Sequence, residues 1–214
     1  MKRWIGFLLH LAMIAILTSF GSYTLDKKAV RQVPDFLRAD LESMSELPQN
    51  FENYFDEDGI APPFLGRSYN GFKDALAFKE SRGRYQVVNT LGYLGKYQFG
   101  LSTLNLMGVY NADRFLADAA LQEAVFDTNI ARNKWILRRD IKTFKGKRIN
   151  GVEITESGIL AAAHLAGAGN VKKYLRSYGK EDVADAYGSN ISYYMRKFAG
   201  YDISAVQRKR NPKV

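Results

Sequence analysis

The sequence predicts a mainly α-helical fold, built as a single domain with at most one small β element. Apolar residues recur at helical spacing in several segments, and the segment 159–166 is apolar nearly all round. Within the irregular stretch 85–99, Val87-Val88 is the sole pair of adjacent β-branched residues, so strand signals are weak there. The length of 214 residues and the apolar fraction of 46% suit one domain with extensions.

The N-terminal residues 1–23 have the pattern of a secretory signal peptide. A basic start is followed by an apolar run over 4–20, and Ser19 and Gly21 supply small residues for cleavage after Gly21. The alternative is an uncleaved membrane anchor, because a run of this length just spans a bilayer. With either a signal peptide or an anchor, the rest of the chain is exported, so we expect a periplasmic or secreted protein, or one anchored in the inner membrane.

Composition excludes several kinds of chemistry. There is no cysteine, which rules out disulfides, cysteine-ligated zinc, a thiol nucleophile and a lipid-modified cysteine. With His10 and His164 as the two histidines, a histidine metal site is not expected, and we predict no cofactor. The formal charge of +9 falls to +7 without Lys2 and Arg3, and this basic balance suits an anionic partner such as cell wall or nucleic acid, or a well-solvated surface.

Four regions are expected along the chain. The leader 1–23 is followed by an N-terminal extension, 24–68, with a helix from Pro34 to Leu47 and then proline and acidic breaks. The domain itself is predicted over 69–203. Residues 204–214 form a basic tail that we expect to be frayed.

Helices dominate the predicted domain. We expect a helix over 71–81 that Gly83 stops, a short helix over 101–107 and a long helix from 118 or 119 to 144. Asp74, Asp118, Glu123 and Asp127 fit exposed helix positions.

The second half of the domain begins with a tight hairpin over 145–153, because Asn150-Gly151 is a strong turn signal. Thr155 caps the helix that contains the apolar segment 159–166 and ends at Gly167. Short helices are predicted over 171–178 and 182–187. A last amphipathic helix follows Ser189 or Asn190, with its apolar side made by Ile191, Tyr194, Met195 and Phe198.

Glu80 is the candidate catalytic residue. Phe72, Leu76 and Glu80 lie at i, i+4 and i+8, so they share one helix face. A carboxyl on an apolar stripe is poorly solvated, which raises its pKa and lets it donate a proton near neutral pH. The loop that follows brings Gly95-Lys96-Tyr97-Gln98 toward it, with an amide and an aromatic ring suited to a sugar.

These motifs together resemble the lytic transglycosylases of the lysozyme-like superfamily. Glu80-Ser81 followed by Gly95-x-Tyr97-Gln98 is similar to the family's Glu-Ser and Gly-Leu-Met-Gln. Ala162 to Gly167 resembles its Ala-Tyr-Asn-Ala-Gly segment, with His164-Leu165 in place of Tyr-Asn, and Asn190 to Phe198 resembles its closing helix. The resemblance extends from Tyr69 to Tyr201 and implies one lysozyme-like domain.

The resemblance also implies an activity. Glu80 would act as the single acid and base: it protonates the glycosidic oxygen between N-acetylmuramic acid and N-acetylglucosamine and then deprotonates the C6 hydroxyl. The product is a 1,6-anhydro ring. Tyr194 matches the tyrosine that points its hydroxyl at the acid, while Ser81, Tyr97, Gln98 and His164 are the expected substrate-binding residues.

Structural interpretations stand beside these roles. Ser81 could simply end the helix, and Gln98 could be an ordinary loop amide. Core positions are the alternative for Tyr97, His164 and Tyr194. Weaker candidates for contact with substrate are Tyr193, Tyr85 and Asn89.

The expected partner is the glycan strand of peptidoglycan, and the expected state is a monomer. A hydrolytic lysozyme, in which water replaces the C6 hydroxyl, is one alternative. A noncatalytic wall-binding module is another. A nucleic-acid partner is not expected, because an exported chain with no nucleic-acid motif argues against it.

Overall fold

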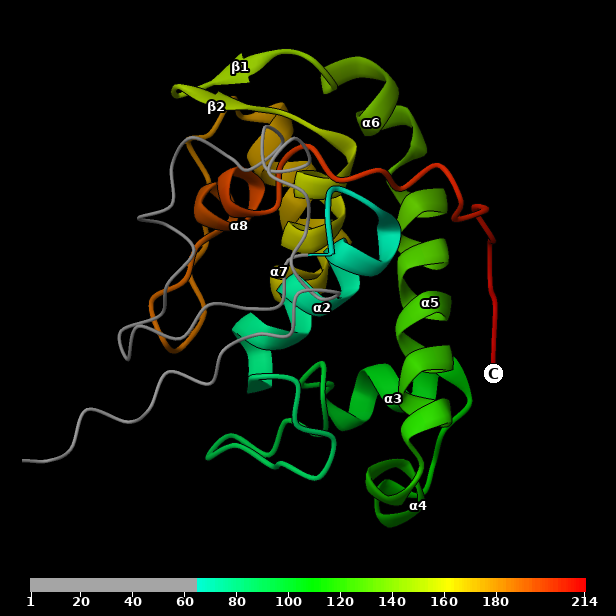
Figure 1. Cartoon of the computed structure of the whole chain (residues 1–214). Coiled ribbons are helices and arrows are strands. Elements are labelled where there is room, and N and C mark those ends of the chain that lie inside the picture. Colours follow the sequence, from blue (N-terminus) through cyan, green and yellow to red (C-terminus); the bar gives the residue numbers. More distant parts are fainter. Residues whose placement is uncertain (1–64) are drawn as a thin grey trace, which may run out of the picture. The chain divides into compact units, whose positions relative to one another are not determined.

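The computed structural model describes residues 65–214, and the predicted leader and the predicted helix after Pro34 lie outside the described residues. The chain divides into two units, Met1–Gln49 and Asn50–Val214, and the described residues belong to the second. They are mainly helical with one small antiparallel sheet, as the sequence predicts (Figure 1).

The described elements follow one another in this order: α2 (Tyr69–Ser81), α3 (Leu101–Met107), α4 (Ala112–Ala117), α5 (Ala119–Ile136), α6 (Arg138–Phe144), β1 (Arg148–Ile149), β2 (Val152–Glu153), α7 (Glu156–Arg176) and α8 (Ile191–Lys197). In the sheet, Arg148 pairs with Glu153 and Ile149 pairs with Val152.

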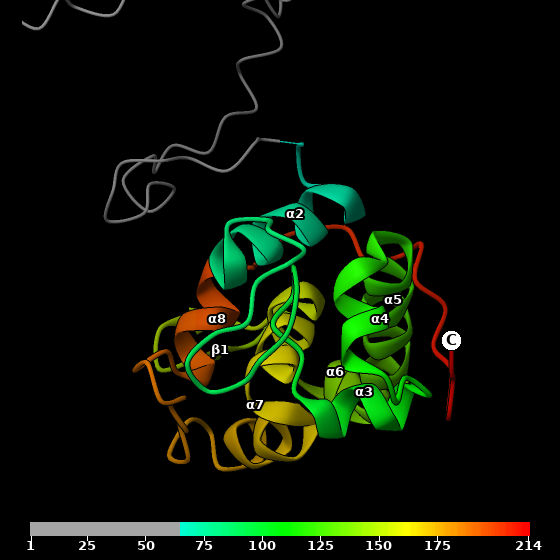
Figure 2. The same cartoon turned by 90° about the horizontal axis from the view of Figure 1, so that it is seen from below.

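Helix α7 forms the centre of the core. Its residues Ile159 to Ala163 are buried, as the predicted apolar segment requires. Helix α8 packs along one side of α7 and α5 along the other, while α2 crosses over them (Figures 1 and 2). Helix α7 therefore lies between α8 and α5.

Several predicted boundaries are confirmed. Residues 101–107 form α3, and the strands β1 and β2 flank the turn at Asn150-Gly151. Thr155 accepts a hydrogen bond from the backbone N–H of Gly158, and Asn190 accepts one from that of Tyr193, so both cap their helices as expected. Gly167, with φ of 79° and ψ of 150°, interrupts α7 at the position where the sequence predicts that the helix ends.

Two predicted helices differ in the structure. The long helix is confirmed from Ala119 to Phe144 except at the fully buried Leu137, where ψ of 4° divides it into α5 and α6. Residues 182–187 are not helical. There the Asp185 side chain accepts the backbone N–H groups of Tyr187 and Ser189, and this local turn competes with a helix.

Two further parts of the prediction need correction. Helix α4 was not expected, although Asn111 caps it by accepting the N–H of Arg114. The C-terminal tail is not frayed: the N–H of Lys209 donates to Ala131 O, and the N–H of Val214 donates to Met107 O. These backbone bonds attach the tail to α5 and to the end of α3.

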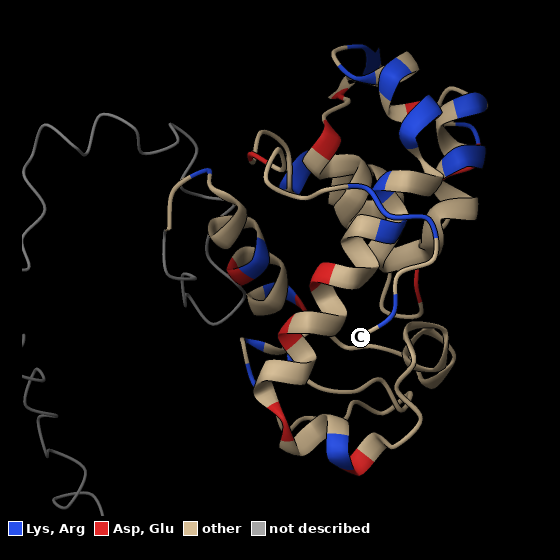
Figure 3. Cartoon of the chain, turned by 90° about the vertical axis from the view of Figure 1, so that its right-hand side faces the viewer, with Lys and Arg blue, Asp and Glu red and all other residues tan. Residues whose placement is uncertain are grey.

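Lysine and arginine gather over α6, the hairpin and the tail (Figure 3). Exposed cations there are Arg139, Lys142, Lys145, Lys147 and Arg148. Arg138 of α6 and Arg210 of the tail both lie over the Trp135 ring, at 4.1 and 5.4 Å from its centroid, so the two basic segments form one surface. Among the residues described, no helix is long and apolar enough to cross a membrane.

The contact between α7 and α8 allows a direct test of packing. A Cβ added to Gly158 would lie 2.5 Å from the Met195 carbonyl oxygen, so Gly158→Ala must push α8 away. We expect a loss of about 1–3 kcal/mol in the free energy of unfolding, measured by urea denaturation. The matched control is Gly169→Ala in the same helix, where a Cβ meets nothing within 4 Å. Equal stability of the two variants would contradict the packing described.

Candidate active site

Glu80 lies in the last turn of α2 and binds Tyr194 of α8. The Tyr194 hydroxyl donates a hydrogen bond of 2.8 Å to Glu80 Oε1, and the tyrosine itself is buried. Helix α2 ends at Ser81, and the next residue, Arg82, adopts a left-handed conformation with φ of 57° while its N–H donates to Phe78 O. The structure thus brings together the acid and the tyrosine that the resemblance pairs.

The pKa of Glu80 is raised from 4.5 to about 7. Burial is the main cause, since it disfavours the charged form. The Tyr194 hydrogen bond and the nearby Lys79 charge lower the pKa in part, and the charge of Asp185 raises it. A carboxyl with this pKa is present in both protonation states near neutral pH, as an acid that later acts as a base must be.

A cleft of about 260 Å³ opens beside Glu80. This volume is slightly below the roughly 300–1,000 Å³ common for small-molecule sites. One wall is the loop 84–99, the other is the loop 183–187, and the helix α7 supplies 164–166. The cleft is lined by Glu80, Asn89, Leu91, Tyr93, Gln98, His164, Leu165, Ala166, Asn170, Val183, Ala184, Asp185, Ala186 and Tyr187.

Gln98 presents an amide to this cleft from a tight turn. Leu94 and Phe99 exchange backbone hydrogen bonds of 2.9 Å, and Gln98 between them has φ of 51°. Its Nε2 donates to Gly95 O at 2.8 Å, which fixes the amide plane. Among the described residues no donor binds its Oε1, so this oxygen is an acceptor available to a ligand such as an acetamide N–H.

His164 holds α7 against the same turn. Its Nε2 is 2.8 Å from the Tyr97 carbonyl oxygen, and a carbonyl can only accept, so Nε2 carries the proton. Burial lowers the pKa of His164 to about 4, and the ring meets the edge of Phe99. Its buried Nδ1 has no partner among the described residues. The imidazole is therefore neutral at pH 7, and its contacts position the turn that carries Gln98.

Tyr97 and Ser81 do not face the cleft. The expectation that the Tyr97 ring stacks on a sugar is wrong, because the ring is fully buried and stacks on Phe126 at 4.0 Å between centroids. The Ser81 hydroxyl donates to Lys96 O at 2.7 Å and accepts the N–H of Arg84. Ser81 therefore attaches the loop to the end of α2, and among the described residues its hydroxyl bonds to backbone groups rather than to Glu80.

Of the three weaker candidates for contact with substrate, one lines the cleft and two do not. Asn89 lines the cleft, and its Oδ1 accepts the backbone N–H groups of Leu91 and Tyr93. Tyr85 points elsewhere and donates to Glu123. Tyr193 is exposed on α8 and lies outside the cleft lining.

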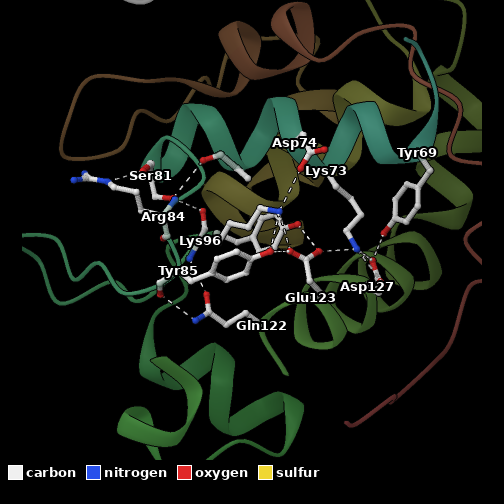
Figure 4. A network of polar contacts seen from close by, with 12 residues as sticks. Tyr69, Lys73, Asp74, Ser81, Arg84, Tyr85, Lys96, Gln122, Glu123 and Asp127 are labelled. Atoms are coloured by element: carbon white, nitrogen blue, oxygen red, sulfur yellow. Dashed lines mark hydrogen bonds and ion pairs between the residues drawn. The ribbon is translucent and has the colours of Figure 1, made fainter. Parts of the chain in front are cut away.

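A charged network fixes the base of the loop (Figure 4). Lys96 Nζ lies 2.8 Å from Glu123 Oε1 and 3.3 Å from Asp74 Oδ1, and Lys73 Nζ lies 2.8 Å from Glu123 Oε2. The Tyr97 hydroxyl donates to Glu123 Oε2 as well. Glu123 is therefore not the exposed acid that its helix position predicts, and Asp74 and Asp127 also pair with these lysines.

The network lowers the pKa of Glu123. Burial alone would raise it, but the hydrogen bonds from Lys73, Lys96, Tyr97 and Tyr85 outweigh burial and bring the pKa to about 2. For the same reason the pKa of Lys96 is raised in spite of its burial. Both partners stay charged, which marks the cluster as a structural ion pair rather than a proton donor.

Sequence reasoning missed the second wall of the cleft. Asp185 is the other carboxylate that lines it, and Tyr187 approaches the first wall, with its hydroxyl 2.9 Å from Thr90 Oγ1. The sequence predicts a helix over 182–187, whereas these residues form the loop that makes this wall. The run Asp185-Ala186-Tyr187-Gly188-Ser189-Asn190 contains a turn signal that could have shown it.

Within residues 65–214 no group of three or more histidine, aspartate or glutamate side chains is placed to hold a metal ion. Comparison with protein-family models, with curated proteins and with solved structures finds no match to this chain.

The network should make stability depend on pH. Glu123 has a lowered pKa, so its contribution is complete above its unfolded value of 4.5 and is lost as the pH falls toward 2. We expect Glu123→Gln to reduce the free energy of unfolding at pH 7 by about 2 kcal/mol, less than for a fully buried pair because Glu123 is partly exposed. The difference should shrink between pH 4.5 and 3 in thermal melts, while the exposed Glu153→Gln should change little. A pH-independent difference would contradict the ion-pair assignment.

The pH dependence of stability that comes from Glu80 should have the opposite sign to that from Glu123. Its pKa is raised on folding from 4.5 to about 7, so stability falls as the pH rises between these values. We expect Glu80→Gln, which keeps an acceptor for Tyr194, to be more stable than the wild type at pH 8 by at most about 3 kcal/mol. At pH 4 the two proteins should melt alike. Exposed Glu181→Gln is the control, and a wild type as stable as Glu80→Gln at pH 8 would refute the buried acid.

Proposed function

We propose that this protein is an exported enzyme that cleaves the glycan strands of peptidoglycan by lytic transglycosylation, through one lysozyme-like domain. The observation that carries the proposal is the partly buried carboxyl of Glu80 at the cleft, with a pKa near 7 and a hydrogen bond from Tyr194. The order and spacing of the motifs support it, because Glu80, Gln98, His164 and Tyr194 come from separate segments that resemble those of the family.

The chemistry begins with Glu80 in its protonated form. It donates its proton to the glycosidic oxygen as the bond between N-acetylmuramic acid and N-acetylglucosamine breaks. The leaving sugar departs with that proton, and Glu80 is now a carboxylate. It then removes the proton from the C6 hydroxyl of the muramic sugar, whose oxygen closes onto the anomeric carbon. A 1,6-anhydro end results, and Glu80 is protonated again.

The other residues hold the acid and the substrate. Tyr194 fixes one carboxyl oxygen from the protein side, so that the rest of the carboxyl is directed to the cleft. The free acceptor of Gln98 suits the N–H of an acetamide group. Exposed apolar surface from Leu91 and Tyr93 suits the face of a sugar ring.

The charge of the domain suits this substrate. Peptidoglycan carries acidic peptides, and the exposed cations of α6 and the hairpin give the protein a basic face (Figure 3). Such a field raises the encounter rate with an anionic polymer and is screened by salt. Export rests on the predicted leader, residues 1–23, which lies outside the described residues.

The test is digestion of purified sacculi, with the released fragments identified by mass spectrometry. We expect the wild type to release fragments with 1,6-anhydromuramic ends and Glu80→Gln to lose at least about a thousandfold in rate, because general acid catalysis alone contributes roughly 10²–10⁴ and Glu80 acts in two steps. Glu181→Gln should match the wild type.

Each alternative has its own outcome in this assay. Fragments with reducing muramic ends would show hydrolysis by water, as in a lysozyme. A wild type that sediments with sacculi but releases nothing would indicate a wall-binding module. Undiminished digestion by Glu80→Gln would overturn the proposed mechanism.

A further inference from the structure

We infer that Asp185 is a second functional carboxylate of this cleft, which faces the sugar as its glycosidic bond breaks and keeps the proton on Glu80 until then. The inference rests on the proposed function and adds to it a residue on the opposite loop. The sequence and the resemblance pointed to one acid, whereas the structure places two along the cleft.

The local structure holds the Asp185 carboxylate in a fixed position. Its Oδ1 accepts the backbone N–H of Tyr187 at 2.9 Å and that of Ser189 at 2.8 Å. The backbone N–H of Asp185 donates to Ser189 O at 2.8 Å, and Gly188 N–H donates to Asp185 O at 3.1 Å. A side chain tied to its own turn in this way loses little freedom when a ligand arrives, so its charge is preorganised.

The second oxygen, Oδ2, has no hydrogen-bond or ion-pair partner among residues 65–214. Among the described residues no lysine or arginine pairs with it, in contrast to Glu123, whose two oxygens are both neutralised by lysines. A carboxylate that lines a cleft and keeps one oxygen unpaired is suited to interact with a substrate carrying positive charge.

Cleavage of a glycosidic bond creates such charge. As the bond breaks, positive charge develops on the anomeric carbon and the ring oxygen of the sugar. A fixed negative charge beside the ring stabilises this state more than the neutral ground state, which lowers the barrier. Asp185 supplies that charge without forming a bond to the sugar or taking a proton.

The same charge acts on Glu80. Three groups act on the Glu80 carboxyl: Lys79 on its own helix, Tyr194 on α8 and Asp185 on the loop. His164 of α7, which lines the same cleft, is neutral at pH 7. Lys79 and Tyr194 favour the ionised form of Glu80, and Asp185 opposes it. Asp185 therefore partly offsets the lowering of the Glu80 pKa by Lys79 and Tyr194 and favours the protonated acid.

The experiment uses Asp185→Asn, because an asparagine Oδ1 still accepts the two backbone N–H groups and preserves the turn. Asp182→Asn is the matched control: this neighbouring carboxylate accepts the N–H of Ser192 and is not part of the cleft lining. Cleavage of a soluble glycan-strand fragment is followed between pH 4 and 9, together with the NMR titration of the Glu80 side-chain carboxyl in the full chain.

We expect Asp185→Asn to lower kcat about tenfold to a hundredfold, with little change in KM. The alkaline limb of the kcat profile and the Glu80 titration should both move to lower pH, by roughly a few tenths of a unit or more. Tyr194→Phe should move both to higher pH, since it removes a hydrogen bond to the ionised form. Asp182→Asn should leave rate and titration unchanged.

The two proposals fail in different ways. If the wild type cleaves and Asp185→Asn leaves kcat and the titration unchanged, the role of Asp185 is overturned while the enzyme stands. If Asp182→Asn has the same effect as Asp185→Asn, the effect is one of net charge, and the inference is likewise overturned. If the wild type releases no fragments at all, the proposed function fails and the role of Asp185 toward a sugar fails with it.

Discussion

The hydrogen bond from Tyr194 to Glu80 joins two helices whose residues are 114 positions apart in the chain. It places a carboxyl at the C-terminal end of α2, where burial and the negative end of the helix dipole both disfavour its ionised form. The remaining parts of the site depend on this arrangement: α7 holds α8 in position, and the loops on either side leave a cleft in front of the acid. A poorly solvated carboxyl lowers the stability of the fold at pH values where it must ionise, and carboxyls with such raised pKa values are common in catalytic sites.

The wall that carries Gln98 is rigid for a different reason. Lys96 is fixed through its ammonium group by Glu123, through its N–H by Gln122 and through its carbonyl by Ser81. Its neighbour Tyr97 is fixed by His164 and by Phe126. Through Lys96 and Tyr97 the loop is thus attached to the three helices α2, α5 and α7, and Gln98 is the next residue along the chain. Charge pairing outside the cleft thereby helps to set the position of the Gln98 amide that lines it.

Local patterns predicted the helices whose apolar faces are simple, and they identified Glu80 because it continues the stripe of Phe72 and Leu76. They failed where distant residues decide the outcome. The helical position of Glu123 indicates exposure, since nothing within α5 reveals that Lys73 and Lys96 arrive from other segments. Asp185 was assigned to a helix, although its side chain binds backbone N–H groups of its own turn. Spacing shows which residues share a face, but not which face will meet a cleft.

The contrast between Glu123 and Glu80 bears on which of the two would donate the proton in the proposed reaction. Glu123 and Glu80 have the same side chain, yet the pKa is about 2 for the first and about 7 for the second. Two lysines hold Glu123 in its ionised form, so it has no proton to donate near neutral pH. Burial raises the pKa of Glu80 more than the Tyr194 hydrogen bond and the Lys79 charge lower it, and the charge of Asp185 raises it further. When environments separate the pKa values of two like groups so widely, the group with the raised pKa is the better candidate for the proton donor of the proposed reaction. Because Glu80 also lines the cleft and Glu123 does not, geometry and electrostatics select the same residue.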